Sequence, residues 1–148
     1  MNINIKKAND NNLMEANKFL NKLIQDETKY DKNLRKDLII ENYYEHKNNN
    51  SIIFLAYDNE VIIGYIYGFI IEDIFLENPS AKLDALFVEE KYRRRGVATK
   101  LINEFISWCN LNNIMYVSVS VLSDNKAAKI LYVKHGFLPK KEELIAQI

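Results

Sequence analysis

The chain has 148 residues and 48% of them are hydrophobic, which is enough for a single domain with a full core. Basic and acidic residues balance at 20 each, so no overall field draws the chain to nucleic acid or to an anionic membrane. The single cysteine, Cys109, cannot form a disulfide within the chain, and there is neither an apolar run of ~18 residues nor a signal sequence. We therefore expect one domain, residues 1–148, in the cytoplasm, with no membrane or nucleic-acid partner.

The first half of the chain predicts a strand, two helices and a hairpin. Alternating apolar residues predict a strand at 2–7, and a capped run with one apolar face predicts a helix after Asp10. A second helical run begins near residue 34 and ends in the polar residues 47–50. The β-branched and aromatic runs 52–57 and 61–71 flank a short turn and predict a hairpin. Gly64 and Gly68 indicate a bulge, or a face where something lies close to the backbone.

The second half alternates strands and helices. It predicts a strand at 83–88, a basic turn, a helix at 97–111, a central strand at 114–122 and a helix that ends at Gly136. The tail has room for one good strand at 144–148 and a shorter one before it. The order β-α-α-β-β-β-α-β-α-β predicts an α/β domain with a mixed sheet.

The basic turn is the first candidate site. A strand that passes through a glycine-containing turn into a helix N-terminus forms an anion site, because the first amides of the helix lack partners and the helix dipole is positive there. Gly96 lets the backbone approach a phosphate, and Ala98 is small. A solvated basic turn explains this stretch alone equally well. The chain has no G-x-G-x-x-G, and Gly96 does not begin a P-loop.

A second motif, N-x-x-A-x-x-x-Y-x-x-x-G-F, occupies residues 125–137. Asn125 and Tyr132 lie seven residues apart, so they share one helix face about 10 Å apart, and Ala128 leaves a shallow groove between them. Together with the strand-loop-R-x-x-G-x-A-helix before it, this motif resembles the GCN5-related N-acetyltransferase (GNAT) superfamily. The resemblance covers the element order of the whole chain and is specific over residues 83–137.

The resemblance implies a mostly antiparallel mixed sheet flanked by about four helices (α/β, or α+β), and direct acetyl transfer from acetyl-CoA to a primary amine of a small molecule or protein. It also implies that backbone amides at 94–99 hold the pyrophosphate and that the backbone edge of 86–88 pairs with the pantetheine. Lys91, Arg94 and Lys129 are alternatives for the 3′-phosphate. The cofactor contacts so implied are Leu86, Phe87, Val88, Arg93, Arg94, Arg95, Gly96, Val97, Ala98, Thr99, Asn125, Ala128 and Lys129.

Two residues are the catalytic candidates. Tyr132 corresponds to the general-acid tyrosine of the family, and the alternative is that it only packs beneath its helix. Asp84 is the candidate general base, on the same side of its strand as Leu86 and Val88. It is short enough that a water would relay the proton, and the alternative is an Asp bonded to a neighbouring loop. The two histidines, His46 and His135, together with Cys109 do not suggest a metal site.

The acceptor is expected between the first two helices and their connection, but the sequence does not identify the amine. The acidic and aromatic candidates there are Glu27, Tyr30, Asp31, Glu41 and Tyr44, while Tyr65 and Tyr67 fit core packing better than a pocket wall. One alternative function is an acyl-CoA sensor without turnover. Another is a small nucleic-acid binder that uses residues 92–95, which zero net charge disfavours. A homodimer through residues 144–148 is a family expectation.

Overall fold

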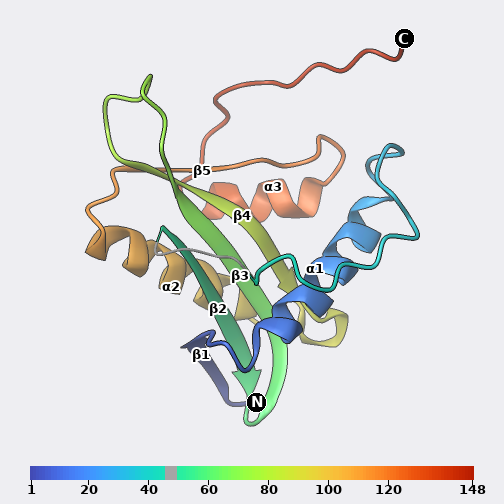
Figure 1. The fold of residues 1–148 in the computed structure, drawn as a ribbon, viewed down its shortest axis with the longest axis vertical. Coiled ribbons are helices and arrows are strands. Elements are labelled where there is room, and N and C mark those ends of the chain that lie inside the picture. Colours follow the sequence, from blue (N-terminus) through green and yellow to red (C-terminus); the bar gives the residue numbers. More distant parts are fainter. Residues whose placement is uncertain (46–49) are drawn as a thin grey trace.

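The computed structural model describes residues 1–45 and 50–148 and contains one five-stranded sheet in the order β1-β2-β3-β4-β5 (Figure 1). The first four strands pair antiparallel, and β4 pairs parallel with β5. The elements in chain order are β1 Ile3–Lys7, α1 Leu13–Glu27, β2 Ser51–Asp58, β3 Val61–Ile71, β4 Ser80–Val88, the 3-10 turn η1 Glu90–Tyr92, α2 Val97–Leu111, β5 Tyr116–Val119 and α3 Lys126–Lys134. The predicted mixed α/β fold is confirmed.

The two long helices cover opposite faces of the sheet (Figure 1). Successive side chains of a strand point to opposite faces, so each strand supplies both layers. On one face, Leu101, Ile102 and Phe105 of α2 pack in a cluster with strand residues that include Leu83. On the other face, apolar residues of α1 pack in a cluster with strand residues that include Phe87. β4 therefore lies at the centre of the packing, with its side chains divided between α1 and α2.

The two strand glycines mark irregularities in the sheet, as predicted. The β2–β3 register shifts opposite Gly64, and the β3–β4 register shifts at Gly68. A Cβ atom at Gly68 would lie 2.2 Å from the Phe105 ring, so only glycine lets α2 pack this close to β3. In the second bulge Tyr67 pairs with Ala85 and Gly68 pairs with Leu83, which leaves Asp84 without a partner in this ladder.

The expected second helix is absent, and the described residues contain three α-helices rather than about four. Residues 34–45 form turns and irregular backbone, and His46 and residues 47–49 lie outside the described residues. The amides of Ile40 and Tyr43 donate to side chains of α1, and the Ile40 carbonyl accepts from Asn21, so the segment is held mainly by α1. Its apolar residues have a helical spacing, but the buried Tyr44 and the half-buried Ile40 pack in the cluster that contains α1.

Two predictions for the C-terminal half are wrong. The strand predicted at 114–122 is β5, which is four residues long and lies at the edge of the sheet, not at its centre. It pairs on one side only, and its first residue, Tyr116, is exposed. The strand predicted at 144–148 does not form, and Leu144, Ile145 and Ile148 are exposed. Within the described residues, no strand lies alongside this tail to pair with it.

Candidate functional site

Strands β4 and β5 diverge soon after they begin. They pair only from Ser80 with Tyr116 to Leu83 with Val119, although β4 continues to Val88. Beyond this point the backbone of β4 has no strand partner on that side among the described residues. A strand edge of this kind offers unpaired N–H and C=O groups to any extended ligand. It is the edge at 86–88 that the sequence predicts for the pantetheine.

The basic turn follows directly and has an open backbone. Arg94 and Gly96 adopt left-handed conformations with φ of 60° and 81°. The first hydrogen bond of α2 runs from the Lys100 amide to the Gly96 carbonyl at 3.1 Å, and no acceptor within the described chain takes the amides of residues 94–99. A Cβ atom at Gly96 would have no heavy atom within 4 Å. Free amides, a positive helix end and this open space fit a diphosphate.

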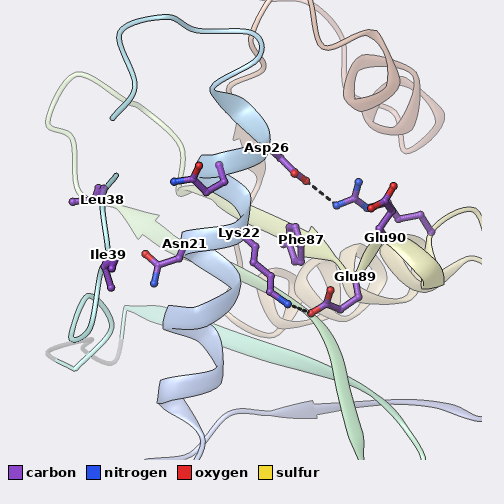
Figure 2. Close-up of a pocket in the computed structure, with 10 residues that line it drawn as sticks. Asn21, Lys22, Asp26, Leu38, Ile39, Phe87, Glu89 and Glu90 are labelled. Carbon is purple, nitrogen blue, oxygen red and sulfur yellow. Dashed lines mark hydrogen bonds and ion pairs between the residues drawn. The ribbon is translucent and has the colours of Figure 1, made fainter. Parts of the chain in front are cut away.

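Arg93 lies in the same turn but is held elsewhere. Its Nε donates to the Val88 carbonyl at 2.8 Å, its guanidinium lies 2.8 Å from the Asp26 carboxylate, and its own amide donates to Glu90. Figure 2 shows this ion pair and that of Lys22 with Glu89, which join α1 to the end of β4 across a pocket of about 420 Å³. Arg93 therefore clamps the site to α1, while the side chains of Arg94 and Arg95 are exposed.

Helix α3 turns the second motif toward the core. Asn125 accepts a hydrogen bond from the Ala128 amide at 3.1 Å and so caps the helix. Asn125 and Ala128 are half-buried and Tyr132 is 9% exposed, so they form the inner face of α3, whereas Lys129 is exposed. Burial first, and the charge of Glu27 second, raise the pKa of Tyr132 above its ordinary value. The phenol therefore keeps its proton at neutral pH.

The bulge in β4 reverses the predicted orientation of Asp84. Leu86 and Val88 pack against the α2 face, but Asp84 lines a pocket of about 390 Å³ on the α1 face together with Glu27 and Tyr43. The extra residue in the strand breaks the alternation from which the prediction was made. Burial raises the pKa of Asp84, and Lys82 opposes that rise.

This second pocket lies where the acceptor site was predicted, but of the predicted residues only Glu27, at the C-terminal end of α1, lines it, whereas Tyr30, Asp31, Glu41 and Tyr44 do not. Tyr44 is 2% exposed, and its hydroxyl lies 2.8 Å from that of Tyr65 in the core. Asn33, Leu34, Arg35, Leu38, Ile40 and Tyr43, which the sequence reasoning missed as site residues, supply the wall instead.

Three side-chain amides of α1 hold that wall in place. Asn21 exchanges two hydrogen bonds with the backbone of Ile40, at 2.9 and 2.8 Å, and Asn17 accepts from the Tyr43 amide at 3.0 Å. Gln25 donates to the Lys36 carbonyl. Positions 17, 21 and 25 are four residues apart and share one face of the helix. We call these residues the amide ladder, and their spacing was a sequence signal for a docked extended segment.

Two surveys of the described residues bear on the class of site. No helix is long and apolar enough to cross a membrane within residues 1–45 and 50–148. Over the same residues, no group of three or more His, Cys, Asp or Glu side chains is arranged to hold a metal ion.

Known proteins share this fold and part of this sequence. A tetramutant of a protein from Bacillus halodurans superposes with a TM-score of 0.85 over 98% of this chain and 99% of its own, at 16% identity. An aminoglycoside N-acetyltransferase in complex with CoA, AAC(6′)-Iy, gives a TM-score of 0.73 over 98% of each chain, at 18% identity. At this identity the superpositions show the fold alone.

Sequence comparison identifies the family. The L-2,4-diaminobutyric acid acetyltransferase of Halalkalibacterium halodurans is 32% identical over 85 residues, which are 54% of this chain and 41% of that protein. The match thus spans less than half of the relative's length. The model of the acetyltransferase (GNAT) family matches residues 17–137, from the amide ladder of α1 through the basic turn to the end of the second motif. The chain therefore belongs to the acetyltransferase (GNAT) family.

Proposed function

We propose that this protein transfers an acetyl group from acetyl-CoA directly to a primary amine of a small molecule or peptide, in the cytoplasm and without a nucleic-acid or membrane partner. One observation carries the proposal. The open edge of β4 runs into a turn with six unbonded amides, and the buried Tyr132 of α3 packs in one cluster with Leu86 and Val88 of that strand. The names of the relatives, a diaminobutyric acid acetyltransferase and aminoglycoside acetyltransferases, support a small amine as the acceptor.

The cofactor-binding part consists mostly of backbone. The amides at 94–99 hold the pyrophosphate, and the unpaired edge of β4 at 86–88 binds the pantetheine arm as a neighbouring strand would. Asn125 uses its oxygen as a helix cap, so its NH₂ group is the part that contacts the arm. Arg94, Arg95 and Lys129 are exposed cations that meet the remaining phosphate charge. Acetyl-CoA, once bound, supplies an acetyl group activated as a thioester.

The chain's own residues then move protons. The ammonium group of the acceptor, with an ordinary pKa of about 10, must lose a proton before its nitrogen can attack, and a carboxylate of the pocket receives that proton. A backbone amide of β4 near residues 86–88 donates to the carbonyl oxygen as negative charge develops on it. Tyr132 protonates the departing sulfur, because its raised pKa keeps the hydroxyl protonated up to alkaline pH.

The test is release of free thiol from acetyl-CoA with a panel of diamines, amino acids, aminoglycosides and peptides. We expect release with at least one amine, together with CoA binding measured by calorimetry. Binding without release for every amine would contradict the proposal and favour the sensor. Absence of CoA binding would contradict both functions.

A further inference from the structure

Glu27 lies where the elements of the site meet. It is the last residue of α1, it is half-buried, and its side chain lines the pocket of about 390 Å³ that Asp84 lines from β4. Its backbone carbonyl accepts from the amides of Tyr30 and Asp31, at 2.9 and 3.1 Å, so the chain turns away here and leaves the carboxylate at the pocket wall. Arg35 lines the same pocket, with its Nε 3.6 Å from Asp37.

The charge of Glu27 reaches groups on two other elements. It is the second cause, after burial, of the raised pKa of Tyr132 on α3, and for Tyr65 on β3 it adds to the larger contributions of burial and of Asp84. Among the described residues, Glu27 has no ion-pair partner, in contrast to its neighbour Asp26, which pairs with Arg93. A carboxylate that lines the pocket without an ion-pair partner among the described residues is placed to exchange a proton with a ligand bound there.

The groups around Glu27 all oppose its ionisation. Burial raises its pKa most, followed by the charges of Asp31 in the next turn, Asp84 across the pocket and Asp26 on its own helix. Among the described residues that line the pocket, the cation is Arg35, whose ion-pair partner is Asp37. A base that holds its proton above the ordinary carboxylate range is better matched to an amine at neutral pH than an unperturbed one.

We propose that Glu27 is the general base, and that it takes the proton from the acceptor ammonium at the mouth of this pocket. The proposal rests on the proposed function. It favours Glu27 over the predicted Asp84 because, of these two residues that line the pocket, the glutamate side chain is one methylene longer and less exposed. Asp84 is then a neighbouring charge that raises the pKa of Glu27 and helps to attract the ammonium.

The proton balance is complete with the residues described. The ammonium N–H bond breaks, and an O–H bond forms on the Glu27 carboxylate, which later gives that proton to solvent. The freed nitrogen lone pair forms the bond to the acetyl carbon, and the C–S bond breaks with its electron pair on sulfur. Tyr132 gives its proton to that sulfur and recovers one from the acetylated nitrogen. The net reaction yields the amide, the free thiol and one proton.

The decisive experiment compares pH profiles of kcat/KM for wild type, Glu27→Gln and Asp84→Asn, with an amine on which wild type releases thiol. For Glu27→Gln we expect a loss of about 100-fold or more at pH 7. This loss should shrink toward pH 10, where the free amine needs no base, and CoA affinity should stay within about twofold of wild type. Asp84→Asn should lose less than about tenfold.

A third variant tests the assignment without removing the base. In the native chain the Asn33 amide donates to the Asp31 side chain at 2.9 Å, and the asparagine of Asp31→Asn keeps an oxygen to accept this hydrogen bond. The substitution removes only the negative charge that raises the pKa of Glu27. We expect the acidic limb of the profile to move to lower pH, since the base then ionises more readily.

Three outcomes overturn the assignment of Glu27 as the base while leaving the proposed function intact. They are a wild-type profile for Glu27→Gln, a loss that does not recover at high pH, and a larger loss in Asp84→Asn than in Glu27→Gln. If the acidic limb of the kcat/KM profile lies at the same pH in Asp31→Asn as in wild type, that result also contradicts the assignment of Glu27 as the base. If wild type releases no thiol with any amine, the proposed function falls and the base assignment falls with it.

Discussion

Tyr132 is the residue on which the proposed chemistry depends most directly. Replacing it with Phe removes the proton donor but keeps the ring, which packs edge-to-face with Phe137 at 5.6 Å. We expect kcat to fall about 100-fold with CoA affinity unchanged, because the hydroxyl acts only as the sulfur leaves. Steady-state rates and calorimetry measure the two quantities. Tyr116→Phe, on an exposed residue of β5, is the matched control, and an unaltered kcat in Tyr132→Phe removes Tyr132 from the mechanism.

Gly96 allows a second residue-scale test, because the chain contains a control glycine in a similar conformation. Gly96 and Gly136 have φ of 81° and 90°, and a Cβ atom at either would meet no heavy atom within 4 Å. An alanine strains both positions by about 1 kcal/mol. We expect both variants to lose similar stability, whereas only Gly96→Ala weakens CoA binding, by tenfold or more. Equal CoA affinity in the two variants would count against the phosphate-loop assignment.

Side-chain roles could be predicted from the sequence where a local motif fixes them. Asn125, Ala128 and Tyr132 lie on one inner helix face as their spacing predicts. Asp84 could not be placed, because a bulge reverses its direction and a bulge depends on the partner strand. Arg93 has the same sequence context as Arg94, and only its contact with Asp26 on α1 separates the two. Contacts across elements are thus the part that the sequence did not reveal.

The amide ladder is the element-scale feature with the clearest consequence. Asn21→Ala removes two hydrogen bonds that fix the pocket wall at Ile40. We expect a loss of about 1–3 kcal/mol in the free energy of unfolding, measured with denaturant, and a higher KM for the acceptor with unchanged CoA affinity. Asn103→Ala, on an exposed position of α2, carries the same change in helix propensity and should show neither effect. Equal behaviour of the two variants would mean that the wall does not depend on the ladder.

Elements with one strong periodicity were predictable, and those that depend on a partner were not. Helix α2 has the predicted bounds, and α1 and the β2–β3 hairpin lie where their apolar patterns place them. The segment at 34–43 has helical spacing, yet its backbone bonds to Asn21 instead of to itself. β5 has the apolar content of a central strand but only one neighbour. The irregular backbone of residues 34–43 and the edge position of β5 both depend on neighbouring elements, so neither can be predicted from the residues of the segment itself.

At the scale of the whole molecule, Glu27 predicts a pH dependence of stability. Its pKa is raised in the folded chain, so folding favours the protonated form, and that contribution is lost as pH rises through the folded pKa. We expect Glu27→Gln to melt at a temperature equal to or above that of wild type at pH 7–8, with the difference closing near pH 4. Melting curves measure this. A large decrease at pH 7 would indicate a structural role for the carboxylate.

The homodimer expected from the family resemblance is a second prediction about the whole molecule. The outer edge of β5 and the exposed residues Leu144 and Ile145 offer unpaired backbone and apolar surface. We expect light scattering to give twice the chain mass, and removal of residues 140–148 to shift the mass toward one chain. A single-chain mass for the intact protein at micromolar concentration would contradict the prediction.

The turn before α2 presents its peptide groups, rather than its side chains, to the expected diphosphate. Selection on such a loop constrains the path of the main chain and, at Gly96, the one conformation that glycine tolerates best. The side chain at position 99 is then constrained less than the path of its backbone, whereas Arg94 and Arg95 add charge to the same loop. A substitution that bends this path should therefore weaken diphosphate binding more than one that changes only the side chain of Thr99.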